Sequence, residues 1–106
     1  RTQWGAESKY RAAECYYNLG AIDMAEQEIM SFTGMQTSHQ YWLAKSLILL
    51  ADINVNRNDL FQAKQYLLAL QNNYRQDDDI STIIADKLEA IQQLETQQNT
   101  DTILTE

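Results

Sequence analysis

The side chains with the strongest chemistry in this chain are one thiol and one imidazole, Cys15 and His39. Together, a thiol and an imidazole can act as a nucleophile and its general base. Here they lie in different segments, and Cys15 follows Glu14, whose negative charge disfavours a thiolate. Neither has a second ligand at the spacing of a metal motif. The sequence therefore predicts no catalytic residue, metal or other cofactor, and it predicts Cys15 to be a core thiol within a helix.

Three consecutive aspartates, residues 77–79, are a second candidate, as a calcium site. A calcium loop spreads its oxygen ligands over about twelve residues, with a glycine at its sharp turn. No glycine lies near this run. Carboxylates are also favoured at the start of a helix, where they oppose the positive end of the helix dipole. We therefore expect the run to begin a helix at about residue 78.

Charge and aromatic content argue against nucleic acid as a partner. The chain has 106 residues, and 15 acidic against 8 basic side chains give a formal net charge of −7. Six tyrosines and two tryptophans offer stacking surfaces, but single-stranded nucleic acid needs positive charge as well. Their helical spacing favours packing inside the protein. No apolar run approaches the roughly 18 residues of a membrane span, so we expect no membrane insertion.

The elements that carry these residues are predicted to be helices. The chain has no proline and three glycines, too few for the turns of a many-stranded β protein. Gly20 and Asn58 can adopt the left-handed conformation that often follows a helix end. Apolar residues recur three and four positions apart in five segments, residues 4–18, 22–33, 41–55, 59–73 and 80–94. The predicted fold is all-α, with about five helices in antiparallel pairs.

Two of these segments have distinct patterns. Segment 41–55 is apolar on almost every side, which predicts a buried central helix. Segment 80–94 is amphipathic, and we expect it to cover the preceding helix or to offer its outer face to a segment that follows it. Its Ile84, Leu88 and Ile91 fall short of the three to four heptads that indicate a coiled coil.

The first four predicted helices contain two copies of one unit. A shift of 38 residues superposes four pairs: Tyr10 on Ile48, Ala13 on Ala51, Gly20 on Asn58 and Ala25 on Ala63. Repeats of this length indicate stacked helical units. The pattern resembles the tetratricopeptide repeat (TPR), with a small residue late in the first helix, glycine at the turn and alanine early in the second helix. It departs from that family because neither copy closes with proline.

The resemblance implies a right-handed superhelix of stacked helix pairs. The implied domain covers residues 1–96, with repeats at about 6–36 and 41–75. The helix at about 78–96 is then either a capping helix or the lone first helix of a third pair. Residues 97–106 are polar and predicted to be a flexible tail. Because the chain begins without methionine or a leader, we expect it to be the C-terminal fragment of a longer bacterial TPR protein.

The resemblance also implies a concave groove lined by the first helix of each pair. The groove positions of the family fall on ten residues here: Glu7, Tyr10, Glu14, Tyr17, Asn18, Lys45, Ile48, Asp52, Val55 and Asn56. Glu14 and Asp52 would repel the C-terminal carboxylate that one branch of the family binds. The expected partner is therefore a protein or peptide segment that is basic or accepts aromatic side chains. The alternative is that both carboxylates are merely solvated.

The predicted function is a non-catalytic scaffold that binds a partner protein in this groove. Family members with divergent repeats and acidic surfaces resemble assembly factors of the bacterial cell envelope, which suggests the periplasm or envelope as the location. One alternative is a structural end-cap of a longer TPR solenoid, since terminal repeats protect the core. Another is self-association into a homo-oligomer through the outer faces of the first and fifth helices.

Overall fold

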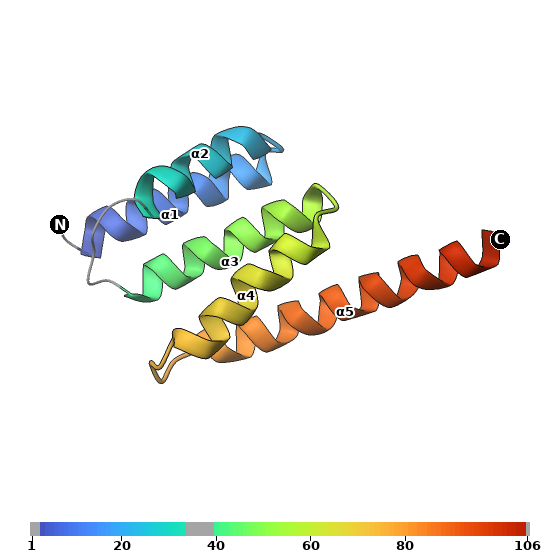
Figure 1. Cartoon of the computed structure of the whole chain (residues 1–106). Helices are drawn as coiled ribbons and strands as arrows, with labels where there is room; N and C mark the ends of the chain where they lie inside the picture. Colours follow the sequence, from blue (N-terminus) through green and yellow to red (C-terminus); the bar gives the residue numbers. More distant parts are fainter. Residues whose placement is uncertain (1–2, 34–39, 106) are drawn as a thin grey trace.

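The computed structural model describes residues 3–33 and 40–105, and within these ranges the side chains of residues 5–31 and 40–99. The described backbone forms five α-helices and no strand, which confirms the predicted all-α fold. Figure 1 shows α1 and α2 as one helical hairpin, α3 and α4 as a second, and α5 following them. The helices are α1 (Gln3–Asn18), α2 (Ile22–Thr33), α3 (Gln40–Asn56), α4 (Leu60–Asn73) and α5 (Ile80–Thr105).

The two hairpins turn through the same backbone geometry. Each turn has three residues, and the middle residue is left-handed: Gly20 has φ 84° and Asn58 has φ 61°. In both turns the next amide N–H donates to the carbonyl five residues earlier, at 2.9 Å in the first turn and 2.8 Å in the second. These bonds satisfy carbonyl groups left open at the helix end. The predicted roles of Gly20 and Asn58 are confirmed.

Aspartate side chains begin α4 and α5. The Asp59 carboxylate accepts the amide N–H of Gln62 at 3.2 Å, and Asp78 Oδ1 accepts the amide N–H of Ile80 at 2.9 Å. Each bond satisfies an amide that has no partner within its helix. The aspartate run at 77–79 therefore starts a helix, as predicted.

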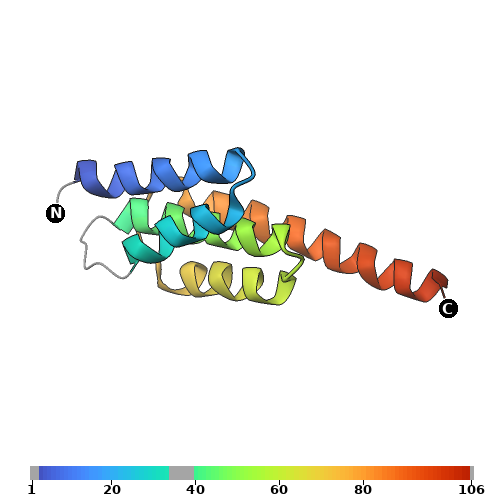
Figure 2. The same ribbon diagram turned by 90° about the horizontal axis from the view of Figure 1, so that it is seen from above.

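The central helix of the fold is α3, which contacts each of the other four helices. Both views place it between α1 and α4 (Figure 1 and Figure 2). One side of α3 packs in a cluster with α1 and α2, and the other side packs in a cluster with α4 and α5. Five alanines, each at most 1% exposed, lie within the two hairpins: Ala13, Ala25, Ala44, Ala51 and Ala63. Their small side chains allow the paired helices to approach closely.

Ser46 is a buried polar residue of α3. The residue is 1% exposed, and its Oγ has no hydrogen-bond partner among the described residues. We expect Ser46→Ala to raise the free energy of unfolding by about 1 kcal/mol in urea titrations, because burial of an unpaired hydroxyl is costly. Ser8→Ala, at an exposed site of α1, controls for the higher helix propensity of alanine. A loss of stability in Ser46→Ala would contradict the prediction.

The last helix is longer than predicted. The sequence predicts an end at about residue 96 and a flexible tail over 97–106, but α5 stays helical to Thr105. The tail contains no glycine or proline that would stop a helix, so polar composition alone did not mark the helix end. Buried Ile80, Ile84 and Ile91 anchor α5 in the cluster with α3 and α4. Its C-terminal part extends beyond the other helices (Figure 1).

Cys15 is exposed on α1, so the predicted core thiol is wrong. The buried side of α1 consists of Ala6, Tyr10 and Ala13, spaced by four and three residues. Cys15 follows Ala13 by two residues, which places it about 200° further around the helix. The many apolar residues of α1 occupy more than one face, and the periodicity alone did not show which face packs.

Candidate functional site

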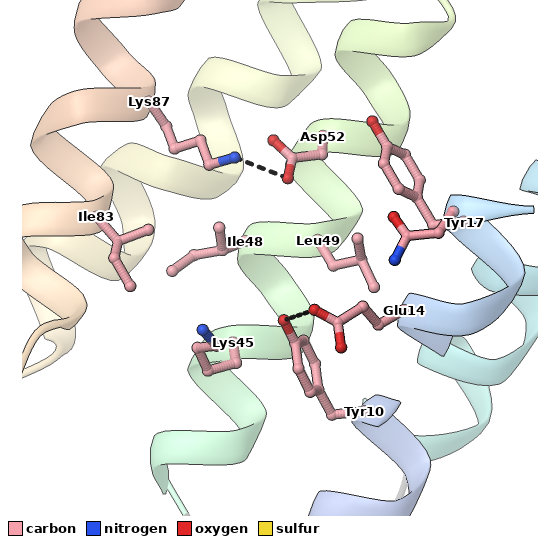
Figure 3. A pocket seen from close by; sticks show the side chains of 10 residues that line it. Tyr10, Glu14, Tyr17, Lys45, Ile48, Leu49, Asp52, Ile83 and Lys87 are labelled. Atoms are coloured by element: carbon pink, nitrogen blue, oxygen red, sulfur yellow. Dashed lines mark hydrogen bonds and ion pairs between the residues drawn. The ribbon is translucent and has the colours of Figure 1, made fainter. Parts of the chain in front are cut away.

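A hollow with a volume of about 260 Å³ lies on the face where α1, α3 and α5 meet. We call it the groove. Figure 3 shows its side chains pointing toward one another from all three helices. The groove is lined by Tyr10, Glu14, Tyr17 and Asn18 from α1, Lys45, Ile48, Leu49 and Asp52 from α3, and Ile83 and Lys87 from α5.

Seven of the ten residues that the sequence predicts for the groove line this hollow: Tyr10, Glu14, Tyr17, Asn18, Lys45, Ile48 and Asp52. The other three lie elsewhere. Glu7 is one helical turn before Arg11, to which its carboxylate pairs at 3.6 Å. Val55 packs against the cluster of α3, α4 and α5, and Asn56 is exposed at the end of α3.

Sequence analysis missed Leu49, Ile83 and Lys87. Ile83 and Lys87 stand four residues apart on α5, so they share one face of that helix. The sequence predicts that α5 covers α4. It also contacts α3, and this contact brings the two residues to the groove. The 38-residue period carries Lys45 onto Ile83, but it carries none of the predicted groove positions onto Lys87.

Tyr10 forms the α1 side of the groove and is 7% exposed. Its Oη donates to Glu14 Oε2 at 3.3 Å, and its ring centroid lies 5.6 Å from that of Trp42 on α3. The Trp42 ring in turn meets Tyr41 edge-on at 5.0 Å. These three rings pack on one another, as their helical spacing predicts, and so fix the position of Tyr10 at the groove.

Burial, then the charge of Glu14 and the hydrogen bond to it, raise the pKa of Tyr10 from 10.0 to about 12. An unfolded chain therefore loses this proton at lower pH than the folded one, so the free energy of unfolding falls between pH 10 and 12. We expect the Tyr10 contribution to this fall to be about 2 kcal/mol. Burial also raises the pKa of Tyr17, Tyr41 and Tyr74, so part of the fall belongs to these residues.

Denaturant titrations of the wild type and Tyr10→Phe across this pH range isolate the contribution of Tyr10. The phenylalanine variant should show the shallower decline, because it lacks the Tyr10 hydroxyl that ionises. It retains the other tyrosines and all lysines, so their contributions are the same in both proteins. Equal declines in the two proteins would show that Tyr10 ionises alike in the folded and unfolded chains.

An ion pair joins α3 to α5 across the groove. Lys87 Nζ lies 2.9 Å from Asp52 Oδ2, and Figure 3 draws this contact as a dashed line. Asp52 is therefore paired rather than merely solvated. On the opposite wall, Glu14 contacts Arg11 at 3.3 Å in addition to Tyr10. Both carboxylates of the groove thus have a cationic partner.

Lys45 differs from the other charged groups of the groove. Its Nζ lies 5.5 Å from the centre of the Tyr10 ring, a cation–π contact. Within the described part of the chain it forms no ion pair with a carboxylate. The residue as a whole is partly exposed.

Among the described residues, the candidates for catalysis and metal binding do not line the groove. Cys15 is exposed and does not line it, and His39 lies outside the described residues, as does the turn around Gly34. Across residues 3–33 and 40–105 no group of three or more His, Cys, Asp or Glu side chains is placed to hold a metal ion. None of the described helices combines the length and apolarity that crossing a membrane requires.

Comparisons with known protein families, with characterised proteins and with solved structures found no significant match to this chain. The chain is therefore classified by its fold and its groove alone. It is an all-α protein of two helical hairpins and a fifth helix, with a groove lined by α1, α3 and α5.

Proposed function

We propose that this chain is a non-catalytic scaffold that binds a segment of a partner protein in the groove, within a TPR-like array of helix pairs. The supporting observation is that the first helix of each pair, with α5 as a third such helix, contributes to a single hollow. Stacked helix pairs create concave binding surfaces in this way. The repeated turn geometry at Gly20 and Asn58 supports the same relation between the two hairpins.

The composition of the groove suits a peptide. Ile48 and Leu49 form an apolar floor at 5% and 6% exposure, and polar groups from α1, α3 and α5 surround it. Binding sites commonly combine apolar lining with a few placed polar groups in this manner. The hollow is partly open to solvent, so it can hold side chains of a segment that continues beyond it.

Selection of peptides from a random library displayed on phage tests this proposal. The bait is the 106-residue chain, and the enriched peptides are then measured on two variants. Glu14→Lys combined with Ile83→Ser alters the groove at two partly exposed positions, whereas Phe61→Ser alters an exposed apolar residue of α4 outside it. We expect the groove variant to lose the peptides and Phe61→Ser to keep them. Circular dichroism checks whether both variants fold.

A structural end-cap is the second candidate, and the outer face of α5 favours it. That face is exposed and mainly polar, where a further repeat would need large apolar residues to pack on. Its residues are Ser81, Thr82, Ala85, Asp86, Glu89, Ala90, Gln92 and Gln93. Terminal units of helical arrays carry such polar outer faces. If no peptide is enriched, or if both variants bind the enriched peptides equally, the end-cap becomes the better explanation.

A further inference from the structure

We infer that the groove prefers peptide segments in which a carboxylate stands beside aliphatic side chains, and that Lys45 holds this carboxylate. The inference deepens the proposed function and rests on it. It concerns an acidic side chain within a segment, and it reverses the basic preference that the sequence predicts from Glu14 and Asp52.

Both carboxylates of the groove already have a cationic partner. The carboxylate of Asp52 is 2.9 Å from Lys87 Nζ, and the carboxylate of Glu14 is 3.3 Å from Arg11. A basic peptide residue would have to compete with these cations for either carboxylate. Lys45 is the groove cation whose charge meets no carboxylate among the described side chains, so an anionic group gains most there.

Three groove residues lie in a row along α3. Lys45, Ile48 and Asp52 are three and four residues apart, so they share one face of the helix. In Figure 3, Ile48 and Ile83 lie between Lys45 at one end and the pair of Asp52 and Lys87 at the other. Seven residues of helix span about 10 Å, roughly the length of three residues of an extended peptide.

This spacing defines the segment. A carboxylate at Lys45 places the next side chains over Ile48 and Ile83, where aliphatic groups bury apolar surface. Polar backbone or side-chain groups then reach the ion pair of Asp52 and Lys87. The net charge of −7 opposes strongly acidic partners at long range, so the structure favours a segment with one or two carboxylates.

Two pools of short synthetic peptides test the inference. Both pools fix an aliphatic residue, flanked by glutamate in one pool and by lysine in the other, with all other positions randomised among uncharged residues. The immobilised 106-residue chain captures peptides, and mass spectrometry measures the retained amounts. We expect the wild type to retain the glutamate pool about tenfold more than the lysine pool, the effect of one favourable charge contact.

Lys45→Glu should reverse this preference. Arg75→Glu makes the same change of net charge at an exposed position outside the groove, and we expect it to keep the preference of the wild type. If the glutamate pool binds equally well to Lys45→Glu and to Arg75→Glu, Lys45 does not hold the carboxylate and the inference is wrong.

The remaining outcomes separate this inference from the proposed function. Preferential retention of the lysine pool, lost in the variant with Glu14→Lys and Ile83→Ser, would overturn the acidic preference and leave peptide binding in the groove intact. Retention of neither pool, together with no enrichment from the phage library, would overturn both.

Discussion

Replacing Ile84 with alanine should lower the free energy of unfolding by about 2–5 kcal/mol. Ile84 is 1% exposed and belongs to the cluster that joins α3, α4 and α5. Truncation removes buried methyl groups and leaves a cavity that the close-packed neighbours fill only in part. A domain of this size has a total stability of about 5–15 kcal/mol, so this single change removes a large fraction of it.

The same substitution should weaken peptide binding, because α5 also carries the groove residues Ile83 and Lys87. Urea titrations measure the stability, and capture of the preferred peptide pool measures the binding. Leu94→Ala is the matched control, since Leu94 lies on the same helix but is 36% exposed. We expect the control to lose less than about 1 kcal/mol. Equal losses in the two variants would mean that α5 is not anchored through Ile84.

Replacing Ala63 with leucine should lower the free energy of unfolding by about 1–3 kcal/mol through overpacking. Ala63 is fully buried in α4 and packs in the cluster with α3. A leucine there needs space that exists only if α3 and α4 move apart. Because the distance between paired helices depends on the side chains at their contact, we expect the strain to spread along the second hairpin.

Thermal melting compares Ala63→Leu with Ala69→Leu, which makes the same change at an exposed position of α4. The exposed variant adds an apolar side chain without crowding, so its melting temperature should stay close to that of the wild type. The buried variant should melt several degrees lower, by about 4–8 °C for each kcal/mol. An unchanged melting temperature for Ala63→Leu would show that the contact between α3 and α4 accommodates the larger side chain without overpacking.

The fold was predictable from the sequence because local signals determine most of it. Gly20 and Asn58 mark the turns, Asp59 and Asp78 supply helix starts, and the apolar spacing identifies each helix. The end of α5 was not predictable, because residues 97–105 lack a stop signal. The exposure of Cys15 depends on which face of α1 packs, and the apolar residues of that helix cover several faces.

The candidate site was predictable only in part. The resemblance to the TPR family implies groove positions on α1 and α3, and seven of these ten residues line the hollow. The contributions of Ile83 and Lys87 depend on how α5 crosses α3, which no local pattern in the sequence determines. For the same reason the sequence did not reveal that Asp52 is paired with Lys87.

The helices on the two sides of α3 can unfold independently of each other. Cα atoms of the first hairpin lie within 8 Å of α3, and those of α3 lie within 8 Å of α4 and α5. Among the described residues no Cα atom of the first hairpin comes that close to α4 or α5. The first hairpin on one flank of α3, or α4 and α5 on the other flank, can therefore detach while the opposite flank remains packed on α3. Amide hydrogens of α3 should exchange with solvent most slowly, because their exposure requires both flanks to detach. A peptide bound across α1, α3 and α5 would join the flanks and make their opening cooperative.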